Sequence, residues 1–248
     1  MNLLLLSAII TLAYAAQTAA GFGATVLAVT IGSFFMPIEA LVPLLVPLSL
    51  AQTLWIGWRH RQQVDTDYLL RRILPLMGVG MLIGFTALSG LGGSTLKLAF
   101  AVMILVLSAR ELIAMSRGTH AGAGSAVAEI AALLGAGVVH GIFATGGPLL
   151  VYAASRRAMD KGTFRSTLIV VWLPLNAVLC AQLIAAGRLT AQQAPSVGIL
   201  LLTLPLGVWL GERIHDRIDE GRFRRMVFSL LLVAALISMG GALLAMGG

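Results

Sequence analysis

The sequence predicts an all-α polytopic membrane protein built from two inverted repeats, each a broken-helix hairpin followed by three transmembrane helices. First, 58% of its 248 residues are hydrophobic and only 11% are charged, whereas a soluble domain is about 25% charged. Second, apolar runs of about 20 residues, long enough to cross the hydrocarbon core, recur along the whole chain. Third, two of the apolar stretches carry a similar glycine-containing break.

The basic charge and the single cysteine exclude several other classes of protein. A net charge of +7 suits basic loops beside a lipid bilayer, and we expect no nucleic-acid partner. Cys180 is the only cysteine, which rules out an internal disulfide and a multi-cysteine metal site; no cofactor or metal is expected. The start, MNLLLLSAII, lacks the cationic region of a signal peptide, and we interpret it as the first membrane segment.

Six apolar runs have the length of one membrane crossing, and two others are longer. The six expected spans cover about 40–57, 73–89, 96–115, 167–186, 194–211 and 226–246. The longer stretches cover about 2–36 and 126–156, and each contains one of the glycine breaks. At about 1.5 Å per residue, a helix of either length would exceed the thickness of the bilayer. Each long stretch must therefore tilt, break or fold back as a hairpin.

The chain divides into two similar halves, residues 1–120 and 121–248, within one transmembrane domain. The break motif Gly21-x-x-Ala24-Thr25 recurs 120 positions later as Gly141-x-x-Ala144-Thr145. After a seven-residue insertion the offset becomes 127, and it relates three further pairs: Pro47-Leu48-Ser49 with Pro174-Leu175-Asn176, Arg61 with Arg188, and Gly80-x-x-x-Gly84 with Gly207-x-x-x-Gly211. Their constant order predicts a two-fold internal repeat, an architecture that many transporters share.

The distribution of arginine and lysine predicts the topology. If each long stretch is a hairpin, four loops share one side and hold 15 of the 17 basic residues: 58–72, 110–125, 156–166 and 212–225. If each stretch crosses once, the bias disappears. The positive-inside rule therefore favours hairpins, with both termini periplasmic. Each half then crosses the membrane an odd number of times, so that the second half is inverted relative to the first.

The two breaks are the expected binding site. A break exposes a helix N-terminus, whose free N–H groups and partial positive charge attract anions. In the second break, Pro148 suits the first turn of a helix that begins near Gly147, and Thr145 either caps this helix or offers its hydroxyl to a ligand. The first break lacks the proline and the glycine pair, so we expect a gentler bend. Alternatively, the glycines serve only close helix packing, which we expect of Gly80, Gly84, Gly207 and Gly211.

We expect substrate-binding residues of two kinds. Those at the breaks are Gly21, Phe22, Gly23, Ala24, Thr25, Gly141, Ala144, Thr145, Gly146, Gly147 and Pro148. Those with polar side chains inside apolar spans are Gln17, Ser49, Gln52, His140 and Asn176. The polar set would line a neutral, donor-rich pocket, although interhelical hydrogen bonding explains any single member equally well. His140 is either a proton-linked switch or a satisfied structural histidine.

Four segments resemble a known family over essentially the whole chain. They are the paired breaks GFGAT and GIFATGGPLL, and the paired spans LKLAFAVMILVLSARELI and FRRMVFSLLLVAALI. Their arrangement resembles the TauE/SafE family of sulfite and organosulfonate exporters. The resemblance implies a transporter of small sulfur-containing anions, mostly outward, in the bacterial inner membrane.

Electrostatics favours export over uptake. About 2.3 kcal/mol per 100 mV drives one negative charge outward across an inside-negative membrane. Uptake would need a coupling cation, usually held by an intramembrane carboxylate, and only Glu129 lies clearly inside an apolar span. An uptake permease for a sulfur source and a scaffold or assembly protein stay open as alternatives. A membrane-embedded enzyme is disfavoured because the four histidines are scattered. The oligomeric state is open, with a homodimer among the alternatives.

Overall fold

The computed structural model describes residues 3–20, 22–60, 63–88, 93–117, 125–157, 159–217 and 220–247. Every regular element within these ranges is helical, as expected where an apolar chain must satisfy its own backbone N–H and C=O groups. In the first half the helices are α1 (Leu3–Ala20), α2 (Ala24–Gly32), α3 (Ile38–His60), α4 (Thr66–Tyr68), α5 (Leu74–Leu88) and α6 (Gly93–Ser116). A π-helical turn, Leu69–Ile73, joins α4 to α5.

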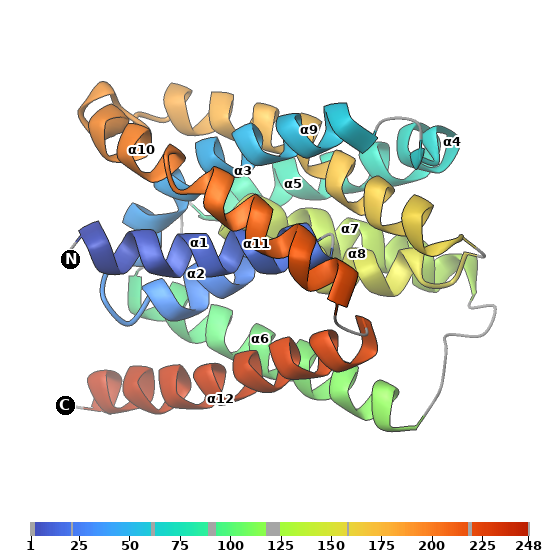
Figure 1. Ribbon diagram of the computed structural model, residues 1–248. Helices are drawn as coiled ribbons and strands as arrows, with labels where there is room; N and C mark the ends of the chain where they lie inside the picture. Colours follow the sequence, from blue (N-terminus) through green and yellow to red (C-terminus); the bar gives the residue numbers. More distant parts are fainter. Residues whose placement is uncertain are drawn as a thin grey trace.

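The second half repeats this order. Its helices are α7 (Ala126–Phe143), α8 (Gly147–Ala154), α9 (Lys161–Ala185), α10 (Ala194–Leu201), α11 (Leu204–Arg217) and α12 (Glu220–Gly247). A 3₁₀ turn, Ala191–Gln193, precedes α10. Figure 1 shows both termini at one end of the bundle and the C-terminal ends of α3, α6, α8 and α11 at the other. The four predicted basic loops follow these helix ends or overlap them.

The apolar helices confirm a protein that crosses a membrane several times. Within the described residues, five helices are long and apolar enough to span it: Ile38–Arg59, Thr66–Ala87, Leu98–Ser116, Ala126–Phe143 and Gly162–Ala185. Four of them match predicted spans. The span expected at 194–211 corresponds to two apolar helices, α10 and α11, which meet at a bend of 42°. Pro205 has no N–H for the carbonyl of Leu201, where α10 ends. The span expected at 226–246 lies within α12.

Each of the two longer stretches is a long helix, a break and a short helix. The long legs α1 and α7 have 18 residues each, whereas α2 has nine and α8 has eight. At about 1.5 Å per residue, α2 and α8 cover roughly 12–14 Å, less than half of a hydrocarbon core of about 30 Å. In each hairpin the second leg is therefore much shorter than the first. Each break separates its two helices by three residues.

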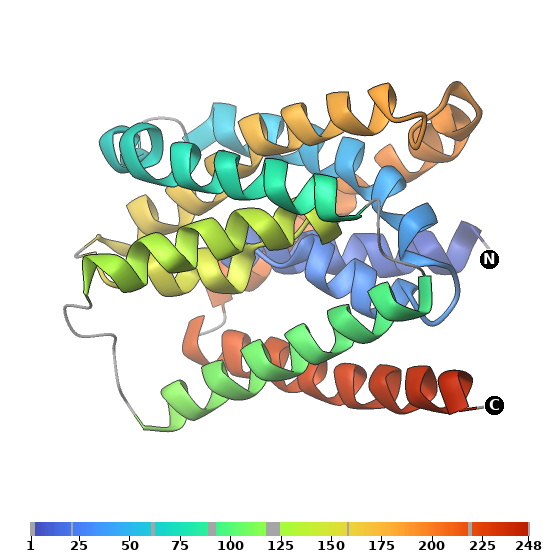
Figure 2. The same ribbon diagram turned by 180° about the vertical axis from the view of Figure 1, so that it is seen from behind.

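Helix pairing is symmetric under exchange of the two halves. The long leg α1 packs against α11, and in the same way α7 packs against α5. The helices α3 and α9, which correspond in the predicted repeat, pack against each other, as do α6 and α12. Figures 1 and 2 show α6 and α12 together along one side of the bundle. This pattern is what a two-fold internal repeat produces.

Glycines allow close contact between α5 and α7 and between α1 and α11. A Cβ on Gly84 would lie 2.1 Å from the carbonyl oxygen of Val138 on α7, and one on Gly80 would lie 2.2 Å from that of Leu134. In the other half, a Cβ on Gly211 would lie 2.4 Å from the carbonyl oxygen of Ala15 on α1. The packing role expected for these glycine pairs is therefore confirmed.

A Gly84→Ala substitution should destabilise the protein by about 1–3 kcal/mol, because backbone of α7 cannot yield to the new methyl group as a side chain would. The matched control is Gly78→Ala on the same helix, where a Cβ meets nothing within 4 Å. Thermal unfolding of detergent-purified protein measures both. Equal melting temperatures for the two variants would contradict the packing assigned to α5 and α7.

Candidate functional site

The two helix breaks depend on left-handed backbone. Gly23, the N-cap of α2, has φ 106°, and Ala144, the C-cap of α7, has φ 54°. Glycine adopts such a conformation freely, but an alanine Cβ there costs about 1–2 kcal/mol. Ala144 is the only non-glycine residue with positive φ in the described part of the chain. Gly21, also predicted to belong to the site, lies outside the described residues.

Replacing Ala144 with glycine should therefore stabilise the protein by roughly 0.5–1 kcal/mol, because relief of the strained backbone exceeds the added entropy of the unfolded chain. The matched control is Ala177→Gly in the middle of α9, where the same change should cost about 1 kcal/mol of helix stability. Melting temperatures that move in opposite directions are the expected result. A lower melting temperature in both variants would show that the backbone at Ala144 is not strained.

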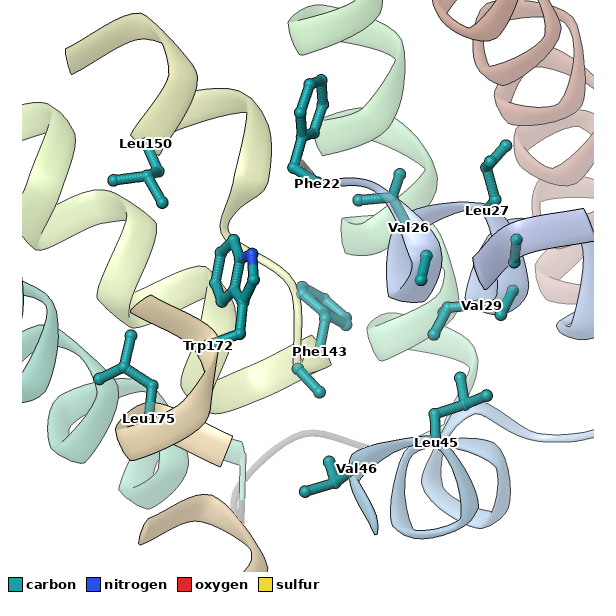
Figure 3. Packing of buried hydrophobic residues seen from close by; sticks show 14 of the residues in the cluster. Phe22, Val26, Leu27, Val29, Leu45, Val46, Phe143, Leu150, Trp172 and Leu175 are labelled. Atoms are coloured by element: carbon teal, nitrogen blue, oxygen red, sulfur yellow. The ribbon is translucent and has the colours of Figure 1, made fainter. Parts of the chain in front are cut away.

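One pocket lies between the two breaks. It is lined by residues of the first hairpin, the second hairpin, α3 and α9: Gln17, Gly23, Thr25, Ser49, Ala144, Thr145, Gly147, Trp172 and Asn176. None of these side chains is charged. Figure 3 shows Trp172 rising from α9 beside the turn that carries Phe143, with Phe22 on the turn before α2. The structure thus brings eight of the predicted residues together, although they come from both halves of the chain.

Both breaks contribute a threonine to this pocket. Thr25 is the second residue of α2, and Thr145 lies just before Gly146, the N-cap of α8. Thr145 therefore does not cap α8. Both side chains are buried, and neither hydroxyl bonds to another described residue. The sequence repeat pairs these threonines, but they occupy different positions relative to the helix that follows each break.

Side-chain amides and an indole add further polar groups to the pocket. The Oε1 of Gln17 accepts a hydrogen bond from the N–H of Ala24 at 3.2 Å, and its Nε2 has no partner in the described structure. The Nδ2 of Asn176 donates to the Oγ of Ser49 at 2.9 Å, which joins two repeat-related residues across α9 and α3. The Nε1 of Trp172 is buried and also without a described partner. Gln17 and Trp172 therefore have N–H donors to spare.

Two helix N-termini meet at the same pocket. Gly23 and Thr25 belong to the start of α2, and Gly147 begins α8 with Pro148 in its first turn, as predicted. The first intrahelical bonds are donated by Leu27 and Leu150. Of the earlier residues, Ala24 donates its N–H to Gln17 and Pro148 has no N–H, so the N–H groups of Thr25, Val26, Gly147 and Leu149 make no bond within their helices. Each N-terminus also carries roughly half a positive charge. The pocket thus receives the N-terminal ends of two helices and contains no charged side chain.

Five of the predicted site residues serve packing at the edge of this pocket. Phe22 stacks near Phe228 with ring centroids 6.0 Å apart, and Ala24 is fully buried. A Cβ on Gly141 would lie 2.2 Å from the Met81 carbonyl oxygen, and one on Gly146 would lie 2.3 Å from that of Ala136. Pro148 lines a separate apolar depression, beside Met103 and Ile104 of α6.

Gln52 and His140 lie outside the pocket lining. Gln52 ties α3 to α1, because its Nε2 donates to the carbonyl oxygen of Tyr14 at 2.9 Å and to the hydroxyl of Thr18 at 2.8 Å. His140 is fully buried, and its ring centroid lies 5.3 Å from that of Trp172. Neither ring nitrogen has a hydrogen-bond partner among the described residues.

Trp172 is the pocket residue that sequence reasoning missed. It lies four positions before Asn176 in α9, so the two share one helix face. An indole N–H inside an apolar span normally needs a partner. The four-residue spacing from Asn176 could have identified Trp172 as a pocket residue. The apolar neighbours of Trp172 made it resemble an ordinary residue of a membrane span.

Comparisons with known proteins agree with this architecture. The model of the family described as "Sulfite exporter TauE/SafE" matches residues 6–238. A "Probable inner membrane transporter protein TsaS" from Comamonas testosteroni is 29% identical over 167 residues, which cover 66% of this chain and 68% of the relative. No solved structure matches. Because the family model spans nearly the whole chain, the protein belongs to the TauE/SafE sulfite exporter family of membrane transporters.

Proposed function

We propose that the protein exports a small sulfur-containing oxyanion, such as sulfite or a sulfonate, across the bacterial inner membrane. Membership of a sulfite exporter family supports the substrate class, and similarity to a probable inner membrane transporter supports the membrane. The observation that carries the proposal is a single pocket lined by both broken hairpins.

The groups around the pocket match the chemistry of such a ligand. A sulfite or sulfonate has only acceptor oxygens, and the lining offers donors: the hydroxyls of Thr25 and Thr145, the indole of Trp172 and the free amide hydrogens of Gln17. Two helix N-termini add partial positive charge. No lining side chain carries a fixed charge, so the anion would be held by dipoles and hydrogen bonds and released readily to the other side.

The packing of α1 against α11 and, in the same way, of α7 against α5 supports transport by alternating access. In inverted-repeat transporters the two repeats rock about a site that both of them line. The charge distribution favours cytoplasmic basic loops and periplasmic termini. The membrane potential then drives the anion outward by about 2.3 kcal/mol per 100 mV, without a coupling ion.

Transport into everted inner-membrane vesicles tests this proposal. Vesicles that contain the protein should accumulate radiolabelled sulfite when the potential inside them is positive, and the rate should fall when the potential is collapsed. Taurine, sulfoacetate, thiosulfate and sulfate added in excess would rank the substrate class by competition. Failure to accumulate sulfite, together with no competition or thermal stabilisation by any of these anions, would contradict the proposed function.

A further inference from the structure

Two arginines share one tyrosine ring at the end of the bundle where the basic loops lie. The guanidinium carbon of Arg110, near the C-terminal end of α6, lies 3.8 Å from the ring centroid of Tyr152 on α8. The guanidinium carbon of Arg156, just beyond α8, lies 4.2 Å from the same centroid. The Nη2 of Arg156 also donates to the Tyr152 hydroxyl. The two carbons are therefore no more than about 8 Å apart, the sum of those distances.

The charges of this pair are not neutralised within the described structure. The ion pairs found there are Arg59–Glu212 and Arg71–Asp67, and neither includes Arg110 or Arg156. The Nε of Arg156 is buried and has no hydrogen-bond partner among the described residues. Like charges within a Debye length, about 8 Å at physiological salt, repel each other. An anion held between the guanidinium groups would remove this repulsion and accept from the free donor.

The corresponding end of the first hairpin has no such cluster. The helices α2 and α8 end alike: Ser33 bonds to the Thr30 carbonyl and Ser155 to the Tyr152 carbonyl through their side chains. The residues that follow are Phe34 and Phe35 after α2, but Arg156 and Arg157 after α8. A repeat alone would give both ends the same chemistry. The cationic pair is thus a feature of one end of the molecule only.

We infer that Arg110, Tyr152 and Arg156 form a second oxyanion site, at the opposite end of α8 from the pocket. Its ligand is a sulfite or sulfonate oxyanion, or the phosphate of an anionic lipid, because both present oxygens that suit the planar donors of arginine. The eight residues of α8 set the two sites about 12 Å apart along the helix axis. The inference does not depend on the pocket's being the transport site.

Sulfite binding to delipidated, purified protein tests one source of the ligand. The assay uses a Thr25→Val, Thr145→Val background, which removes pocket hydroxyls and leaves the arginine pair intact. In that background Arg110→Gln or Arg156→Gln should weaken the remaining sulfite binding about tenfold or more, the loss expected for a hydrogen bond to a charged group. Arg156→Lys keeps the charge and should bind at intermediate strength. Arg117→Gln, directly after α6 and exposed, is the matched control and should bind as the background does.

Lipid retention tests the other source. Native mass spectrometry should show that phosphatidylglycerol is lost from Arg110→Gln and Arg156→Gln but kept by Arg117→Gln. Weaker binding of either probe supports the site and identifies its ligand. Normal binding of both sulfite and phosphatidylglycerol by Arg110→Gln and Arg156→Gln would overturn it. If the threonine variants bind sulfite normally while the arginine variants do not, the pocket proposal fails and this site stands.

Discussion

Replacing Gly147 with leucine should abolish sulfite binding and transport while the protein still folds and inserts. Gly147 lines the pocket at the start of α8, and a Cβ there would lie 2.9 Å from Cδ2 of Phe22. The neighbour is a side chain, which can shift, so the fold survives. The isobutyl group then projects into the space between the two breaks. Overpacking of this kind costs about 1–3 kcal/mol of stability. Because the leucine also occupies the space that the anion needs, affinity should fall about a hundredfold or more.

Two controls separate blockage from misfolding. Gly147→Ala should weaken binding less than leucine does, and Phe22→Ala combined with Gly147→Leu should recover part of the affinity, because space is restored. Gly146→Leu should instead impair folding, since its Cβ would meet the backbone of Ala136. Full activity of Gly147→Leu would show that the second break does not line the binding site.

Thr25→Val and Thr145→Val should each weaken binding of sulfite about ten- to a hundredfold, because each removes one hydrogen bond to a charged ligand. Valine has nearly the same shape as threonine, and neither hydroxyl has a partner among the described residues. Stability should therefore stay constant or rise slightly. Isothermal titration of purified protein measures the affinity, and thermal unfolding measures the stability.

Thr53→Val is the matched control for this pair. Thr53 is equally buried, but its hydroxyl donates to the carbonyl oxygen of Ser49 at 2.8 Å and lies outside the pocket. It should leave the affinity unchanged. An effect of Thr145→Val without any effect of Thr25→Val would restrict the site to the second hairpin.

The large features of this fold could be predicted from sequence because they depend on local physics. Long apolar runs indicate membrane-spanning helices. Pro148 indicates the first turn of α8, because a residue there needs no backbone N–H. The repeat offset relates Ser49 to Asn176, and the structure shows that their side chains are hydrogen-bonded. This contact joins residues 127 positions apart, so no local pattern could reveal it.

The role of a glycine could not be predicted from sequence where it depends on which other helix the glycine contacts. Gly141 and Gly147 belong to one motif in the sequence, yet Gly141 faces the α5 backbone and Gly147 faces the pocket. Gln52 likewise resembles a pocket residue but binds α1 instead. Arg165 falls within the basic loop predicted at 156–166, but its Nη2 donates to the Thr18 carbonyl oxygen at 2.6 Å, near the end of α1. Each of these roles arises from long-range contacts.

The most direct test of the shared pocket is to locate a bound anion. Selenite has the shape and charge of sulfite, and its selenium scatters X-rays anomalously. Crystals of the purified protein grown with selenite should show an anomalous peak between the two breaks, within hydrogen-bonding reach of both Thr25 and Thr145. A peak that touches only one hairpin, or a peak beside Arg110 and Arg156 with none in the pocket, would contradict a single site shared by the two halves.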